Sequence, residues 1–79
     1  MTDLKQLLTD IAASLVDHPD QIEVEVVEED EKELTLELRV AEEDMGKVIG
    51  RHGRIANAIR MVMRSAANAN GKRVTVDIR

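Results

Sequence analysis

The residues best suited to chemistry in this chain are two glycines three positions apart, Gly50 and Gly53, with Arg51 and His52 between them. Neither glycine has a Cβ, so the turn that they form lets another molecule approach the backbone closely. Apolar residues on both sides recur at helical spacing, which predicts that the turn joins two helices. Backbone N–H groups at the start of the second helix, together with the helix dipole, attract a phosphate. The segment is therefore a candidate phosphate site.

Other residues that could carry catalysis or hold a metal do not form a recognisable set. The chain has no cysteine, so a thiolate metal site is excluded. Gly46-Lys47 lacks the rest of a Walker loop, and no strand precedes the glycines as a dinucleotide fingerprint requires. The acidic run at residues 28–31 lacks the alternating ligands and the glycine of a calcium loop. We therefore expect a protein with no enzymatic activity, no cofactor and no metal.

Charge is distributed unevenly along the 79 residues. Residues 1–44 hold 15 acidic and three basic side chains, whereas residues 45–79 hold one acidic and eight basic ones, within a net charge of −5. The basic residues gather around the glycine turn, so we expect one face that binds an anion on an otherwise acidic particle. The alternative is that folding interleaves the two halves and leaves no basic patch.

Three helices are expected to position the turn. The first runs from Leu4 to Leu15, where apolar residues recur at helical spacing, and it ends before Pro19. Thr2 or Asp3 can cap its start. A short helix begins near residue 41, and a longer one spans residues 54–69 and stops at Asn70-Gly71, a typical helix end.

Three strands complete the expected fold. Residues 22–26 and 34–40 alternate between apolar and polar side chains and predict a hairpin with a charged turn, and residues 74–78 predict a third strand. The order is therefore helix, strand, strand, helix, helix, strand, in one α+β domain. Strands with a single apolar face indicate a sheet with helices on one side and water on the other.

The long helix leaves one question open. Its expected core stripe consists of Ile55, Ile59, Val62, Ala66 and Ala69. Met61 lies well round the helix from that stripe, close to Met63, Arg60 and Arg64. The methionines either fill gaps in the core or form an exposed apolar strip for a second subunit.

The segment from Val48 to Ile55, placed between two helices in this order of elements, resembles the KH-domain family, whose loop of two glycines three apart clamps nucleotides. The core would span residues 34–78. The helix and strand that precede it, within residues 2–28, are similar to the extension of the type II, bacterial form. The resemblance covers residues 1–79 as a single domain and implies a three-stranded mixed sheet with three helices on one face.

The resemblance also implies a ligand, single-stranded RNA, whose backbone would pass over the glycine loop. Ile49 and Ile55 would border an apolar groove floor for the bases, and Lys47, Arg51 and Arg54 would supply positive charge. His52 is expected to be a solvated loop residue or a contact to phosphate. The expected RNA-binding residues are Lys47, Ile49, Gly50, Arg51, His52, Gly53, Arg54 and Ile55.

Small members of this family are associated with self-pairing and with pairing to a larger KH protein. We therefore expect a homodimer, or a heteromer with such a partner, through Arg60, Met61 and Arg64. The implied role is RNA chaperoning in post-transcriptional regulation. No stretch approaches the length of a membrane span and no secretion signal is evident, so a cytoplasmic location is expected. The alternative function is a protein-pairing adaptor that uses the fold without binding RNA.

Overall fold

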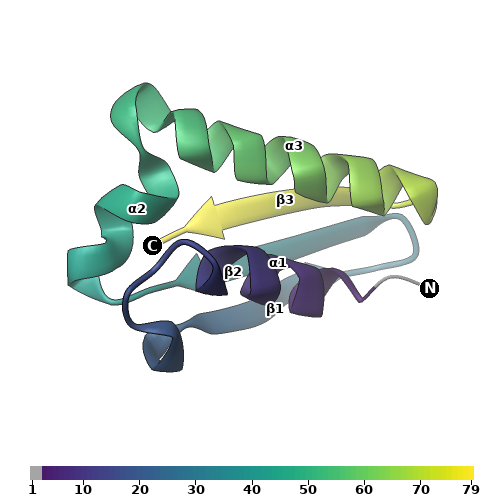
Figure 1. Ribbon diagram of the computed structural model, residues 1–79. Coiled ribbons are helices and arrows are strands. Elements are labelled where there is room, and N and C mark those ends of the chain that lie inside the picture. Colours follow the sequence, from purple (N-terminus) through teal and green to yellow (C-terminus); the bar gives the residue numbers. More distant parts are fainter. Residues whose placement is uncertain (1–2) are drawn as a thin grey trace.

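A computed structural model describes residues 3–79 and contains the six expected elements in the expected order (Figure 1). The protein is therefore an α+β domain with the element order of the type II KH fold. Short 3-10 turns lie at Pro19–Gln21, Glu42–Asp44 and Arg51–Gly53. The helices and strands are α1 (Leu4–Ala13), β1 (Glu23–Glu29), β2 (Glu33–Arg39), α2 (Met45–Ile49), α3 (Arg54–Ala69) and β3 (Arg73–Ile78).

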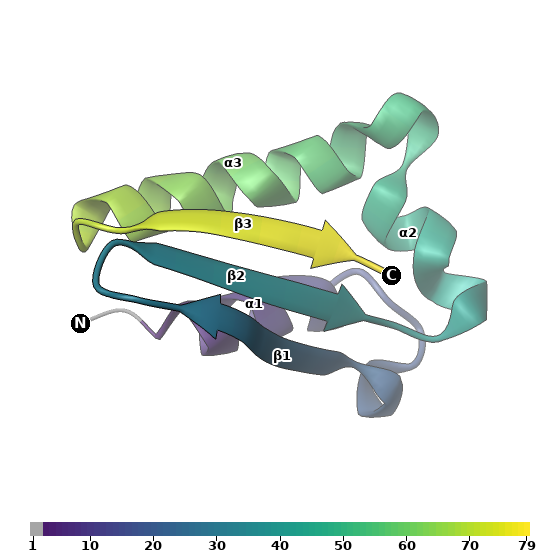
Figure 2. The same cartoon turned by 180° about the vertical axis from the view of Figure 1, so that it is seen from behind.

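The sheet is mixed, as expected, with the order β1-β2-β3. β1 and β2 form an antiparallel hairpin, whereas β2 and β3 run parallel, with Leu36 opposite Val76. The helices lie on one face of the sheet, and the described residues place no helix on the other (Figure 2). α2 and the glycine turn lie at the end of the molecule where β2 and β3 finish.

α1 begins as predicted and ends early. The Asp3 carboxylate accepts a hydrogen bond of 3.1 Å from the N–H of Gln6 and so caps the helix; the alternative cap, Thr2, lies outside the described residues. The helix ends at Ala13 rather than near Leu15, and Ser14 donates its hydroxyl to the carbonyl of Ile11 over 2.6 Å. A serine that bonds to nearby backbone competes with helix continuation.

The core stripe of α3 is displaced by one position from the predicted one. Its buried residues are Ala56, Ile59, Met63 and Ala67. Val62 is 50% exposed and Ala69 is also exposed, so the prediction was wrong at these two positions. Two sets of apolar residues, one position apart, satisfy the same helical spacing. The small side chains of Ala56 and Ala67 let the observed set approach the sheet closely.

The two methionines of α3 have opposite environments. Met63 is completely buried in the core, whereas Met61 is 65% exposed. The core interpretation is therefore right for Met63, and Met61 has the exposure that the second interpretation requires.

The sheet departs from simple alternation at two places. Glu37, expected on the wet face, is only 7% exposed, because Arg39 and Arg79 approach its carboxylate within 2.7 and 3.6 Å. Val26, expected to be buried, is 41% exposed, and a register shift follows it, leaving Val27 as a bulge.

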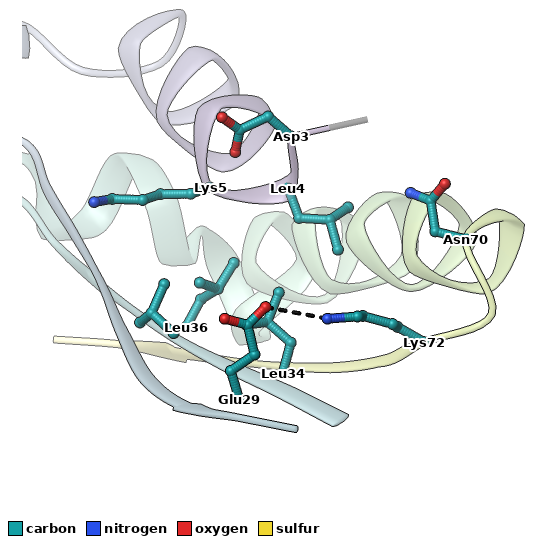
Figure 3. A pocket seen from close by; sticks show the side chains of 9 residues that line it. Asp3, Leu4, Lys5, Glu29, Leu34, Leu36, Asn70 and Lys72 are labelled. Atoms are coloured by element: carbon teal, nitrogen blue, oxygen red, sulfur yellow. Dashed lines mark hydrogen bonds and ion pairs between the residues drawn. The ribbon is translucent and has the colours of Figure 1, made fainter. Parts of the chain in front are cut away.

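A groove beside Val26 explains its exposure. It has a volume of about 340 Å³ and opens between the start of α1 and the hairpin (Figure 3). Leu4 and Leu36 form part of its apolar lining, and Lys72 at its rim forms an ion pair of 3.1 Å with Glu29.

Within residues 3–79, no helix is long and apolar enough to cross a bilayer.

Replacing Met63 and Val62 separately by alanine tests which face of α3 packs into the core. Met63→Ala should lower the free energy of unfolding by about 2–5 kcal/mol, because it leaves a cavity in a fully buried site. Val62→Ala should cost under about 1 kcal/mol. Urea denaturation measures both, and equal losses would contradict the observed helix orientation.

Candidate nucleic-acid interface

The glycine turn joins α2 to α3, as predicted, and three of its four residues have a positive φ. Gly50 has φ 72° and ψ 177°, His52 has φ 56° and ψ 24°, and Gly53 has φ 72° and ψ 18°. The N–H of Gly50 donates to the carbonyl of Gly46 over 2.9 Å and so closes α2. This combination leads the chain from α2 into α3 within four residues.

Gly50 is required for two independent reasons. The φ and ψ of its backbone lie in a region that is almost exclusive to glycine. A Cβ at this position would also lie 2.6 Å from Cγ1 of Ile55, so the Ile55 side chain packs directly on the glycine. Gly53 has open space where its Cβ would be, so only its backbone conformation favours glycine there.

The N-terminus of α3 has no side-chain cap. Gly53 occupies the cap position and can offer none, so within residues 3–79 the first-turn N–H groups of this 16-residue helix have no side-chain acceptor. Arg51, His52 and Arg54 are all exposed around these groups. Backbone donors, the positive end of a helix dipole and two guanidinium groups thus lie together, which is the arrangement that binds a phosphate.

Lys47 was expected to add charge to the same site, but its ammonium is engaged elsewhere. Its Nζ lies 2.7 Å from the Asp17 carboxylate and 3.4 Å from that of Asp44. The hydrogen bond to Asp17, reinforced by Asp44, raises the pKa of Lys47 above its ordinary value despite partial burial. Of the three basic residues predicted around the loop, Arg51 and Arg54 are the two without such carboxylate partners in the described chain.

Of the two isoleucines that were expected to border one groove floor, Ile55 lines a groove. Ile55 and Arg54 line an apolar groove of about 340 Å³ between α1 and α3. Ile49 does not line it and instead packs, half buried, against the core. The other residues of this groove, here called the α1–α3 groove, are Ile11, Leu15, Ala58, Ile59 and Val62.

A second groove lies on the other flank of α3, against the edge strand β3. It has a volume of about 120 Å³ and is lined by Arg60, Arg64 and residues 74–76. The Nε of Arg60 donates to the carbonyl of Val76 over 3.2 Å. This α3–β3 groove therefore holds two of the three residues that were expected at a subunit interface, and Met61 is not among its lining residues.

Asp44 is a residue whose role sequence reasoning missed. It stands at the end of a run of three acidic residues, and, unlike the exposed Glu42 and Glu43, it is completely buried. Its carboxylate accepts hydrogen bonds from the N–H groups of Asp17, over 3.2 Å, and His18, over 3.0 Å. In a run of three acidic residues, the sequence does not indicate which side chain is buried.

The environment of Asp44 shifts its pKa through opposing effects. Burial alone would raise the pKa of this carboxyl, but the two N–H donors and the Lys47 ammonium outweigh it and leave the pKa below its ordinary value of 3.8. The ionised form is thus the one that the fold accommodates. Among residues 3–79, no group of three or more His, Asp or Glu side chains is placed to hold a metal ion.

Comparison with known proteins gives a consistent result. A family model described as "KhpA/KhpB, KH domain" matches residues 5–78. The RNA-binding protein KhpA of Clostridium acetobutylicum is 57% identical over 75 residues, which are 95% of this chain and 99% of that protein. The RNA-binding protein KhpA of Clostridium perfringens is 51% identical over 75 residues, with the same coverage of both chains. That of Caldanaerobacter subterraneus subsp. tengcongensis is 49% identical over 73 residues, covering 92% of this chain and 96% of that protein.

Substituting single glycines by alanine tests the geometry of the turn. Gly50→Ala should lower the free energy of unfolding by about 1–3 kcal/mol, because alanine is strained in this conformation and its Cβ would collide with Ile55. Gly46→Ala is the matched control, since Gly46 lies within α2 with nothing within 4 Å of its Cβ position. That change should stabilise the protein by up to about 1 kcal/mol. Chemical denaturation that ranks the two in reverse order would contradict the turn described here.

Asp44 should make stability depend on pH in the acidic range. Its pKa is lower in the folded chain, so its contribution is complete above its ordinary value of 3.8 and is lost as the pH falls through the folded pKa. Asp30, whose pKa is lowered by the N–H groups of Lys32 and Glu33, acts in the same direction. We therefore compare the wild type with Asp44→Asn, in which Asp30 is unchanged.

The melting temperature of Asp44→Asn should be lower than that of the wild type by about 5 °C or more at pH 7. The difference should narrow as the pH falls below 3.8, because the Asp44 carboxyl of the unfolded wild type becomes protonated there, while that of the folded wild type is protonated only at lower pH. Thermal unfolding followed by circular dichroism measures both curves. A difference that stayed constant from pH 7 to pH 3 would show that the charge of Asp44 is not what stabilises the fold.

Proposed function

The chain belongs to the KhpA/KhpB family of KH domains, and on that premise we propose that it binds single-stranded RNA and has no enzymatic activity. The observation that carries the proposal is the N-terminus of α3, which has no side-chain cap and is surrounded by Arg51, His52 and Arg54. The RNA backbone passes over Gly50 to Gly53, and a phosphate accepts hydrogen bonds from the first turn of α3. The relatives named above are RNA-binding proteins, which supports the proposal.

From the loop, the strand continues along one of the two flanks of α3, and we assign it to the α3–β3 groove. Arg60 and Arg64 make this flank positive. β3 is an edge strand, so its outer backbone groups face the groove and can form hydrogen bonds with base edges. The α1–α3 groove offers Ile55 as an aliphatic surface but carries only one charged residue, Arg54.

Self-association is the second part of the proposal. Met61 and Val62 are exposed by 65% and 50%, and Val62 continues into the apolar α1–α3 groove. We assign this side of α3 to a second copy, or to a larger KH partner of the KhpB kind, and the basic side, with Arg60 and Arg64, to RNA. A single short groove binds RNA weakly, and two grooves on a dimer raise the effective concentration of the second contact. Such a protein would act in post-transcriptional regulation in the cytoplasm.

The exposed apolar strip also favours a second candidate function, an adaptor that pairs with proteins and does not bind RNA. Its contacts would use Met61 and Val62 and leave the glycine loop without a ligand. The two functions differ in what a negative charge at the loop should do, because only RNA brings phosphate there.

Replacing Arg51 and His52 by aspartate tests the RNA proposal. The double variant Arg51→Asp/His52→Asp should bind single-stranded RNA at least about tenfold more weakly, because carboxylates would face phosphate. Fluorescence anisotropy with a labelled oligonucleotide measures the affinity. For the wild type, about four phosphates, neutralised by the four arginines of the loop and the α3–β3 groove, predict a slope of about −3 in log affinity against log salt.

The charge-matched control is Lys5→Asp/Gln6→Asp, which changes the net charge equally at the start of α1, at the other end of the molecule from the loop (Figure 1). It should bind RNA nearly as the wild type does. Sedimentation of every variant, with Met61→Asp as the variant expected to be monomeric, separates loss of RNA binding from loss of pairing. RNA binding that survives in Arg51→Asp/His52→Asp would reject the glycine loop as the RNA site, whereas a wild type that pairs but binds no RNA would favour the adaptor.

A further inference from the structure

Asp44 occupies the cap position of α2 but does not cap that helix. A cap aspartate ordinarily accepts from the second or third N–H of its own helix, and no such bond forms here. Both carboxylate oxygens turn instead to the segment that follows α1, where Oδ1 accepts from the N–H of Asp17 and Oδ2 from that of His18. The carboxylate is completely buried, so it ties two segments together inside the protein.

Two further contacts join the same pair of segments. The Lys47 ammonium bridges the carboxylates of Asp17 and Asp44 at 2.7 and 3.4 Å. On the outside, Nε2 of His18 lies 3.2 Å from Oε2 of Glu43. The connection between α1 and β1 is therefore fastened to the chain just before and within α2.

α2 depends on such contacts because it is very short. It has five residues, whereas isolated helices shorter than about 12 residues are marginal in water. Its buried side chain, Val48, anchors it to the core. The hydrogen bond from the N–H of Gly50 to the carbonyl of Gly46 makes the glycine turn its direct continuation. Where α2 lies thus determines where Gly50 lies.

We propose that Asp44 and Lys47 are positioning residues that hold α2, and with it the Gly50–Gly53 turn, in the place where the turn meets the RNA backbone. Lys47 acts through the carboxylates of Asp17 and Asp44 and makes no contact with phosphate. This inference rests on the proposed RNA function, and it assigns to Lys47 a role different from that of a basic residue in an RNA-binding patch.

Positioning and phosphate contact predict different effects on RNA binding. Removing a lysine that neutralises a phosphate makes the salt slope shallower by about 0.7. Removing a positioning lysine lowers affinity and leaves the slope unchanged. For Asp44, simple electrostatics predicts the opposite sign from positioning, because loss of a negative charge should strengthen binding to RNA.

The experiment compares four variants at a temperature where each is folded. Lys47→Met and Asp44→Asn should each weaken RNA binding about fivefold with the wild-type salt slope, whereas Arg54→Met should also make the slope shallower. Leu4→Ala is the stability control, since Leu4 is buried at the start of α1. It should lower the melting temperature and leave RNA affinity unchanged. Fluorescence anisotropy at several salt concentrations gives both quantities.

A readout without RNA keeps this inference separate from the proposed function. In amide spectra of the free protein, Asp44→Asn should shift the signals of residues 46–53 more than those of β3, and Leu4→Ala should not. Unchanged or tighter RNA binding by Asp44→Asn, or a slope in Lys47→Met as shallow as in Arg54→Met, would overturn the inference. If the wild type bound no RNA, the proposed function would fail, and amide shifts spread evenly over the chain would then overturn the positioning of the turn as well.

Discussion

The parallel pairing of β2 with β3 is the constraint on which the rest of this structure depends. Parallel neighbours need a crossover that returns the chain to the starting end of the sheet. Here α3 makes that return, since its 16 residues span about 24 Å and the six residues of β3 about 20 Å. α2 and the glycine turn must then reverse the chain where β2 ends. The candidate RNA site is thus the part of the crossover where the direction changes.

Local pattern predicted the fold well because each element carries its own signal. The alternation of β2, the helical spacing of α1 and the two glycines each depend on neighbours in sequence. The errors arose where tertiary contacts decide. Ile59 belongs to both possible apolar sets of α3, and only packing against the sheet selects the set with Ala56 and Met63 over that with Val62.

The backbone conformation of the candidate site could be predicted from the sequence, whereas the ion pairs of its charged residues could not. The positive φ of Gly50 and Gly53 follows from residue type, because few other residues adopt it. The pairing of Lys47 with Asp17 and Asp44 joins residues from different elements, which no local spacing indicates. The same holds for Ile49 and Ile55, which are near in sequence although only Ile55 lines the α1–α3 groove.

The bulge at Val27 has a consequence for how copies of this chain can assemble. β1 is a free edge of the sheet, and an edge with regular spacing invites a strand from another molecule to extend the sheet. The extra residue breaks that spacing, and Glu23, Glu25, Glu28 and Glu29 place like charges along the same strand, so two β1 edges repel each other. Growth by continuous sheet formation is therefore disfavoured at this edge. The exposed Met61 and Val62 lie on the helix α3, which offers no strand edge from which the sheet could be extended.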